Sequence, residues 1–155
     1  MVEHVSLKVK RLPHCKDLPR YATPGSAGMD LTAAIEEPYT LEAGKRYAMP
    51  TGLIVEIPPN YEGQVRPRSG LAFKAGISLT NCVGTIDSDY RGEVKVLLIN
   101  HGETAYTFEP GERIAQLLVT PVPIVEIQEV DELNESEERG AGGFGSTGRG
   151  VLAAK

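Results

Sequence analysis

VGTIDSDYRGEVKVLL, residues 83–98, decides the fold class because it contains two strand-like arms around a turn. The first arm, VGTI, is short and apolar, and the second, EVKVLL, has apolar residues at alternate positions. Alternation with a period of two is typical of a β-strand that buries one face. The intervening SDYRG is typical of a turn. The stretch therefore predicts a β-hairpin.

The rest of the chain repeats this strand pattern. Apolar side chains alternate over 5–9 and 53–57, and turn-forming stretches such as TPG at 23–25 and EPGE at 109–112 separate the segments. The 11 prolines and 17 glycines are spread evenly, which suits many short strands. The one helical candidate is SGLAFKAG at 69–76. We therefore predict an all-β barrel or sandwich.

Composition limits the class of partner. The 155-residue chain is long enough for one domain, and its formal net charge of −5 argues against a nucleic-acid polymer but permits a small phosphate ligand. Cys15 and Cys82 have no metal-ligand spacing and indicate a reducing compartment. The first residues lack a signal-peptide core, and no apolar run has the length of a membrane span. We expect a cytoplasmic protein, or a nuclear one if the source is eukaryotic, with no membrane partner.

The turn of the predicted hairpin contains candidate catalytic and binding residues. Asp87 either caps the hairpin or acts as a base at the mouth of a pocket. Tyr90 has the size to form the floor of a sugar site, and Asn81 has the donor and acceptor to read a nucleobase edge. A calcium loop starting at Asp87 is excluded, because Arg91 and Leu98 would occupy its fifth and twelfth positions.

A second candidate site precedes the helical segment. Arg68 offers a charged fork, Ser69 a hydroxyl, and Gly70 close approach of a ligand to the backbone. With the free N–H groups of a helix N-terminus, these residues could hold phosphate. The alternative interpretation is a capping serine beside surface arginines.

Two further polar residues lie in strand-like segments. Gln116 interrupts the apolar run RIAQLLV at 113–119, so it must bond either neighbouring backbone or a ligand oxygen. Asp30 follows a turn and is expected to make structural hydrogen bonds. No chemistry is predicted for the three histidines, which are far apart in the sequence.

The C-terminal stretch RGAGGFGSTG, residues 139–148, is neither a dinucleotide-binding motif nor a Walker A motif. Too few residues follow it to complete a βαβ unit, and Arg149 and Gly150 stand where a Walker A motif has Lys and Ser/Thr. The acidic run at 126–140 predicts a solvated linker before it. The glycines favour either a flexible tail or a segment that orders over an anionic, ring-bearing ligand, with Phe144 on the ring.

Five segments together resemble the ordered motifs of the trimeric deoxyuridine triphosphatase (dUTPase) family. They are PGSAGMDL at 24–31, PRSGLAFKAGI at 67–77, GTIDSDYRG at 84–92, RIAQLLV at 113–119 and RGAGGFGSTG at 139–148. The resemblance implies a jelly-roll-like β-barrel over 1–134, and a flexible acidic linker with a Gly-rich lid over 135–155. It also implies a homotrimer with shared active sites, and Mg²⁺-dependent hydrolysis of dUTP to dUMP and pyrophosphate.

The resemblance also implies a role for each matching residue. One set contacts the base and sugar: Asn81 and the backbone of Thr85 and Ile86 read uracil, Tyr90 packs under the deoxyribose, and Lys95 lies beside the nucleotide. Asp87 would hold the attacking water. Another set would contact phosphates: Arg68, Ser69, Gly70 and Gln116. Asp30 would have a supporting role. The metal would be held mainly by substrate oxygens. The lid would add Arg139, Phe144, Gly145, Ser146 and Thr147.

Three alternative functions differ in what the protein would release. A dCTP deaminase, which shares the fold, would release ammonia. A regulatory nucleotide-binding protein would bind dUTP without releasing pyrophosphate, and a structural β-trimer would have no use for the glycine-rich segment. The IDSDY sequence at 86–90 and the presence of Ser69 favour hydrolysis.

Overall fold

The computed structural model describes residues 4–134 and 141, in which short antiparallel strands predominate. The elements are β1 (Lys8–Arg11), β2 (Arg20–Tyr21), β3 (Met29–Thr32), β4 (Tyr39–Leu41), β5 (Arg46–Glu56), β6 (Tyr61–Pro67), α1 (Ser69–Ala75), β7 (Ile77–Leu79), β8 (Gly84–Ile86), β9 (Glu93–Asn100), β10 (Tyr106–Phe108) and β11 (Arg113–Pro121). The prediction of an all-β fold with one short helix is confirmed.

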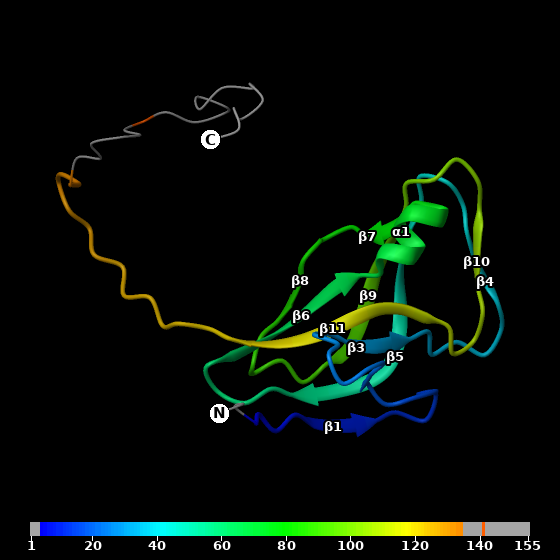
Figure 1. Cartoon of the computed structure of the whole chain (residues 1–155), viewed down its shortest axis with the longest axis horizontal. Coiled ribbons are helices and arrows are strands. Elements are labelled where there is room, and N and C mark those ends of the chain that lie inside the picture. Colours follow the sequence, from blue (N-terminus) through cyan, green and yellow to red (C-terminus); the bar gives the residue numbers. More distant parts are fainter. Residues whose placement is uncertain (1–3, 135–140, 142–155) are drawn as a thin grey trace, which may run out of the picture. The chain divides into compact units, whose positions relative to one another are not determined.

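Two larger sheets enclose the core (Figure 1). Four strands pair in the order β1-β5-β9-β7 and five in the order β2-β3-β11-β6-β8, while β10 and β4 form a separate pair. Alternate residues of β9 are buried, and Val96 and Leu98 pack in one apolar cluster with Leu31 and Leu117 from the five-stranded sheet. Burial of apolar side chains from both sheets is the main stabilising contribution in such an arrangement. In the described residues the sheets are open rather than closed on themselves.

The predicted hairpin at 83–98 is wrong in its pairing, although its strands and turn are present. β8 pairs with β6 in the five-stranded sheet, whereas β9 pairs with β5 and β7 in the four-stranded sheet. The turn after Ile86 therefore crosses from one sheet to the other. The segment 84–96 is thus a β-arch, in which two consecutive strands join different sheets. Alternation predicts that a strand buries one face but not which strand it pairs with, so both arrangements satisfy the same pattern.

Two other predicted elements have different boundaries. β1 begins at Lys8 rather than Val5, because its partner β5 ends at Glu56, directly opposite Lys8. In α1 the N-cap is Arg68, in extended conformation and without a side-chain capping bond, so the interpretation of Ser69 as the capping residue is wrong. The helix ends at Gly76, whose φ of 68° is the left-handed conformation that glycine adopts readily.

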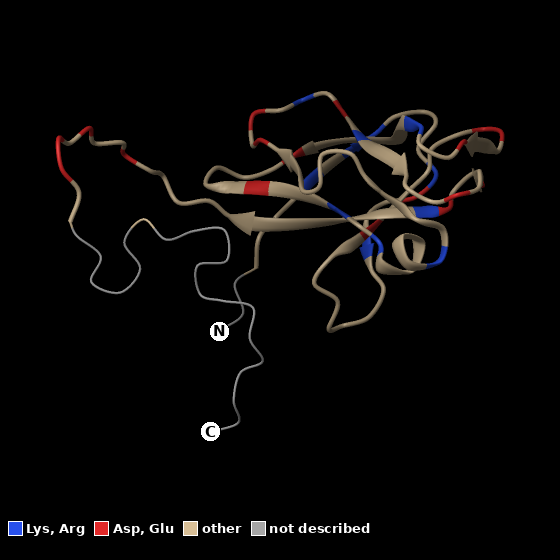
Figure 2. Cartoon of the chain, turned by 90° about the horizontal axis from the view of Figure 1, so that it is seen from above, with Lys and Arg blue, Asp and Glu red and all other residues tan. Residues whose placement is uncertain are grey.

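The chain divides into two compact units, Met1–Ile124 and Val125–Lys155. In the second unit, residues 125–134 form neither helix nor strand, are exposed, and include four acidic residues, which are red in the cartoon of Figure 2: Glu126, Glu129, Asp131 and Glu132. The predicted lid residues 139–140 and 142–148 lie outside the described residues. The proposed division at 134/135 stays a prediction.

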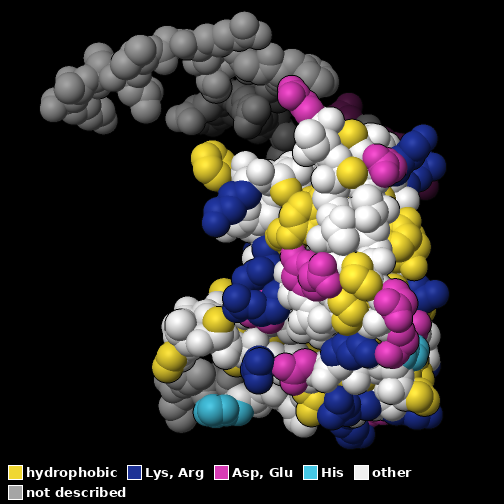
Figure 3. Space-filling model, turned by 90° about the vertical axis from the view of Figure 1, so that its right-hand side faces the viewer, with side chains coloured by type: hydrophobic (Ala, Val, Ile, Leu, Met, Phe, Trp, Pro, Cys, Tyr) yellow, Lys and Arg dark blue, Asp and Glu magenta, His cyan; other side chains and the backbone are white. Residues whose placement is uncertain are grey.

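The surface of the first unit carries charges of both signs. Basic and acidic side chains are interspersed among apolar ones on the face shown in Figure 3. The described part of the chain contains no helix with the length and apolar character needed to cross a membrane.

Candidate active site

The predicted site residues of the described chain fall into two clefts. The first, the arch cleft, has a volume of about 500 Å³ and lies between the two sheets, beside the turn of the β-arch. Its lining includes six predicted residues and six others: Asn81, Thr85, Ile86, Asp87, Tyr90 and Lys95, with Val65, Leu79, Gly84, Glu93, Val94 and Leu97.

Hydrogen bonds within the turn hold Tyr90 across the arch cleft. The Tyr90 N–H donates to the Asp87 carbonyl at 3.1 Å, and the Tyr90 hydroxyl donates to the Glu93 carbonyl at 3.0 Å. A Cβ on Gly92 would lie within 2.9 Å of three Tyr90 atoms, so glycine at this position leaves room for the ring. Tyr90 is consequently held at its backbone and at its hydroxyl, although it is 45% exposed, and the Asp87 side chain beside it is exposed as well.

Asn81 and Gly84 approach each other at the inner end of the arch cleft. A Cβ on Gly84 would lie 3.1 Å from the Asn81 amide nitrogen, which is closer than most side chains tolerate. Glycine therefore keeps this end of the cleft open to a flat group, and the Asn81 amide offers that group a donor and an acceptor.

Glu93 lies at the other side of the arch cleft and was not predicted as a site residue. Its Oε1 accepts hydrogen bonds from His14 Nε2 at 2.7 Å and from the Gly52 N–H at 2.9 Å. Burial raises the pKa of the Glu93 carboxyl, but the bonds from His14 and Gly52 and the charge of Lys95 outweigh it, so the pKa lies below its ordinary value of 4.5. No sequence pattern connects His14 with Glu93, because they are 79 positions apart.

The second cleft, the arginine cleft, has a volume of about 610 Å³ and contains the predicted phosphate-binding residues. It lies where β6 meets α1, and three cationic side chains and one carboxylate contribute to its wall. Its lining is Ala22, Ser26, Ala27, Gly28, Asp30, Arg68, Ser69, Gly70, Leu71, Lys74, Ala75, Tyr106, Arg113 and Gln116.

Asp30 orients two arginines in this cleft. Its carboxylate oxygens lie 3.4 Å from Arg68 Nε and 3.1 Å from Arg113 Nη1, and Arg68 also donates to the Arg113 carbonyl at 3.2 Å. The Asp30 side chain is only 16% exposed. A mostly buried carboxylate between two guanidinium groups restricts their rotation. This geometry supports the predicted supporting role of Asp30 and adds Arg113, which the sequence interpretation missed.

Gln116 bonds to neighbouring backbone, the first of its two predicted possibilities. Its Nε2 donates to the Pro67 carbonyl at 3.1 Å, at the end of β6. A Cβ on Gly28 would lie 2.5 Å from Gln116 Oε1, so Gly28 makes room for this side chain. The Gln116 amide thus stands between β3 and the residue before Arg68, inside the arginine cleft.

Tyr106 is a further residue that the sequence did not single out. Its hydroxyl donates to Glu112 Oε1 at 2.5 Å. Burial, together with the hydrogen bond to the Glu112 carboxylate, raises the pKa of Tyr106 to about 12. The hydroxyl therefore remains neutral at the wall of the arginine cleft throughout the physiological pH range.

The chain thus forms a β protein with two clefts, one lined by an amide, an exposed carboxylate and a tyrosine, and the other by two arginines and a lysine. The dUTPase family model matches residues 15–148. The chain is 60% identical over 125 residues to the deoxyuridine 5'-triphosphate nucleotidohydrolase of Aquifex aeolicus, covering 79% of this chain and 83% of that protein. It is 54% identical over 156 residues to the enzyme of the same name from Methylocella silvestris, covering 98% and 97%.

The chain is also similar to solved structures of dUTPases. The Staphylococcus bacteriophage 80alpha dUTPase with dUPNHPP superimposes with a TM-score of 0.83 at 28% identity, covering 93% of this chain and 99% of that one. The chain therefore belongs to the dUTPase family. The predicted lid residues Arg139, Phe144, Gly145, Ser146 and Thr147 lie outside the described residues, and their roles stay predictions.

The carboxylate of Glu93 is expected to make folding stability depend on pH. Its pKa is lowered in the folded protein, so its stabilising contribution is present above about pH 4.5 and is lost as pH falls through the folded pKa. In urea titrations, we expect the difference in unfolding free energy between wild type and Glu93→Gln to shrink between about pH 5 and pH 3.

Glu56→Gln is the matched control for this prediction. Lys8 also lowers the pKa of Glu56, but the Glu56 side chain is 47% exposed, so solvent screens the pair. Its effect should be the smaller of the two. A Glu93→Gln difference that stays constant down to pH 3 would show that the carboxylate charge does not stabilise the fold.

Proposed function

We propose that this protein hydrolyses dUTP to dUMP and pyrophosphate, which removes dUTP from the nucleotide pool and supplies dUMP for thymidylate synthesis. Family membership supports this activity. One structural observation supports this activity most directly: the two clefts present different chemical groups. One presents an amide, an exposed carboxylate and an aromatic ring, and the other presents arginines. These are the groups needed for a base, a sugar and a triphosphate.

Each active site is assembled from more than one copy of the chain. Ile86, directly before Asp87, pairs with Gly63 near the start of β6, whereas Arg68 follows the end of that strand. Gly63 and Arg68 are five positions apart in extended chain, or about 16.5 Å at about 3.3 Å per residue. The two clefts share no lining residue. A water held by Asp87 and a phosphate held by Ser69 of the same chain are too far apart to react, so a homotrimer brings the arch cleft of one copy to the arginine cleft of another.

The reaction is an in-line attack of water on the α-phosphorus. Asp87 accepts a proton from the water, an oxygen–phosphorus bond forms, and the bond from the α-phosphorus to the bridging oxygen breaks to release pyrophosphate. General-base assistance of this kind contributes about 10²–10⁴-fold. The exposure of the Asp87 carboxylate leaves it accessible to that water.

The arginine cleft stabilises charge on the leaving group. Arg68, held in place by Asp30, and the Ser69 hydroxyl donate to phosphate oxygens on which negative charge accumulates. In the described residues, no three His, Cys, Asp or Glu side chains are grouped to hold a metal ion, and Asp30 already bonds two arginines. The residues present therefore fit Mg²⁺ that binds with the triphosphate, where it neutralises phosphate charge.

Selectivity arises mainly in the arch cleft. Asn81 and the backbone around Thr85 and Ile86 pair with the edge of uracil, and the confined space excludes the thymine methyl group. Tyr90, held at its backbone and at its hydroxyl, packs under the deoxyribose and leaves no space for a 2′-hydroxyl. The glycine-rich segment 139–148 closes as a lid, with Phe144 on the base and Arg139, Ser146 and Thr147 on the terminal phosphate.

Asp87→Asn is expected to abolish turnover without abolishing binding. Asparagine keeps the shape of the side chain but cannot accept the proton, so kcat should fall by about 10²–10⁴-fold while the Kd for dUTP changes little. Pyrophosphate release and calorimetric titration measure the two quantities. Asp89→Asn, an exposed carboxylate of the same turn, is the matched control and should retain activity. Near-normal turnover in Asp87→Asn would exclude Asp87 as the base.

Mixed trimers test the shared site. Asp87→Asn and Ser69→Ala chains should each be nearly inactive alone. When they are co-refolded in equal amounts, random assembly should restore about one quarter of wild-type activity, because that fraction of sites combines an intact arch cleft with an intact arginine cleft. No recovery in a mixture shown to contain mixed trimers would place both clefts of each site in one chain.

Removal of residues 139–155 tests the lid. Loss of stacking by Phe144 and of charged contacts by Arg139 should lower kcat/KM for dUTP by at least about a hundredfold, while folding and trimerisation are unchanged. Pyrophosphate release from dUTP, dTTP, dCTP and UTP, together with light scattering, provides the measurement. Full activity in the truncated protein would remove the lid from the mechanism.

A further inference from the structure

The turn at 12–15 is bound tightly to a bulge in β5. The Leu12 N–H donates to the Gly52 carbonyl at 2.8 Å, and the Cys15 N–H closes the turn on the Leu12 carbonyl at 3.0 Å. Gly52 has a φ of 69°, and a Cβ there would lie 2.4 Å from the Cα of Cys15. Only glycine allows this approach, so the turn and the bulge form one rigid contact.

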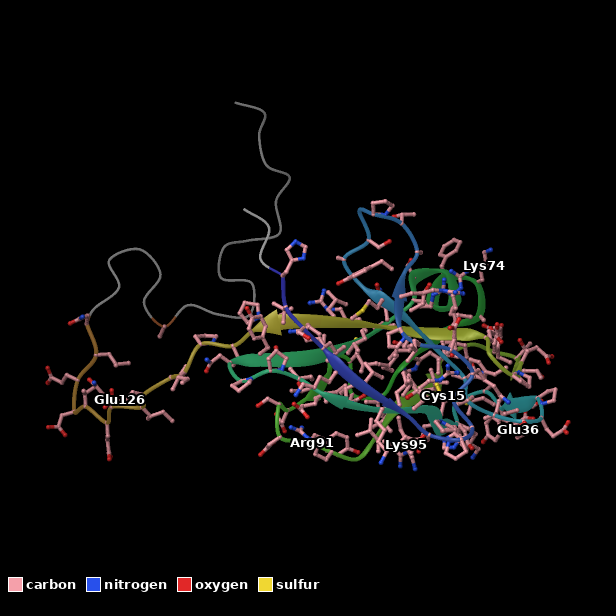
Figure 4. All side chains as sticks on the ribbon, turned by 90° about the horizontal axis from the view of Figure 1, so that it is seen from below. Cys15, Glu36, Lys74, Arg91, Lys95 and Glu126 are labelled. Carbon is pink, nitrogen blue, oxygen red and sulfur yellow. The ribbon has the colours of Figure 1, made fainter. Side chains whose placement is uncertain are left out.

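The same bulge is bonded to the start of β9. The register between β5 and β9 shifts between Pro50 and Ile54, and the buried Thr51 hydroxyl in the shifted stretch donates to the Val94 carbonyl at 2.6 Å. The next residue, Gly52, donates its N–H to the Glu93 carboxylate at 2.9 Å. The turn at 12–15 is thus connected, through the bulge, to the strand that lines the arch cleft. Cys15 and Lys95 are labelled over this part of the sheet in Figure 4.

His14 bonds the same Glu93 carboxylate oxygen as the Gly52 N–H. Its Nε2 lies 2.7 Å from Glu93 Oε1, and since an ionised carboxylate only accepts, the imidazole N–H donates. The Glu93 side chain is 17% exposed and the His14 side chain 37%. The backbone carbonyl of the same Glu93 accepts the Tyr90 hydroxyl. Glu93 therefore contacts His14 through its side-chain carboxylate and the Tyr90 ring, at the floor of the proposed sugar site, through its backbone carbonyl.

We propose that His14 is a positioning residue that sets sugar selectivity by holding Glu93, and through it Tyr90, in place. The proposal rests on the dUTP-hydrolysing function above, in which Tyr90 packs under the deoxyribose. Without the imidazole, Glu93 keeps the Gly52 N–H but loses its second donor in a mostly buried position. The carboxylate then turns toward water or toward Lys95, the other charged group that acts on it. Because the Gly52 N–H bonds the same carboxylate oxygen, the contact between the bulge and the Glu93 backbone loosens, and the carbonyl that accepts the Tyr90 hydroxyl shifts.

His14→Ala and His14→Gln separate this role from a structural one. Glutamine places an N–H donor near the position of Nε2, so it should preserve the bond to Glu93. Pyrophosphate release from dUTP and UTP gives the selectivity as a ratio of kcat/KM values. We expect His14→Ala to lower this ratio about 3- to 10-fold, mostly through the KM values, and His14→Gln to stay within about twofold of wild type. His4→Ala, an exposed histidine, is the control and should match wild type.

A double-mutant cycle with Tyr90→Phe tests whether His14 acts through the ring hydroxyl. Tyr90→Phe removes the bond to the Glu93 carbonyl, so His14→Ala should have no further effect on selectivity in that background. Additive effects would overturn the proposal, as would an unchanged ratio in His14→Ala, or equal loss of selectivity and thermal stability in His14→Ala and His14→Gln. If the wild type released no pyrophosphate from dUTP, the proposed function itself would fail, and the inference with it.

Discussion

The proposed site depends on one constraint, the length and pairing of β6, which set the distance between its two groups of residues. β6 pairs along its length with β11 and over Gly63–Val65 with β8, which holds it extended within the sheet. One end lies beside the turn that carries Asp87, and the other continues through Pro67 into Arg68 and α1 (Figure 1). A rigid strand of this length keeps the base-binding and phosphate-binding residues of one chain apart. Oligomerisation is therefore a requirement of the proposed chemistry, not only a source of stability.

A local electrostatic arrangement lets an acidic protein bind a highly anionic substrate. The chain has a formal net charge of −5, yet Arg68, Arg113 and Lys74 line one cleft with a single carboxylate. Asp30 reduces the charge of this group but holds the guanidinium forks in one orientation, which lowers the entropy lost when phosphate binds. The neutral Tyr106 hydroxyl, whose proton is donated to Glu112, adds no charge to the wall. Net charge therefore describes the whole surface and says little about this cleft.

The sequence predicted what depends on local pattern and missed what depends on distant partners. Alternation over 94–98 and the short helix at 69–75 were both visible, because burial of one face and helix propensity are encoded in neighbouring residues. The cluster of candidate residues around Asp87 was visible for the same reason. The pairing of β8 with β6 instead of β9, the fork between Asp30 and Arg113, and the bond of His14 to Glu93 were not, because each joins segments far apart in sequence. Gly52 illustrates this limit: its need to be glycine comes from the backbone of Cys15, which no pattern around residue 52 reveals.

The β-arch explains why two kinds of recognition meet in one cleft. In a hairpin, both arms would belong to one sheet and pair with each other. In the arch, Thr85 and Ile86 belong to the five-stranded sheet, while Glu93 and Lys95 belong to the four-stranded sheet. In the proposed function, the backbone of one sheet thus faces the base, while the Tyr90 hydroxyl donates to a carbonyl of the other sheet. Base and sugar selectivity consequently rest on separate supports, so a change in the turn at 12–15 can alter the second without moving the strand that determines the first.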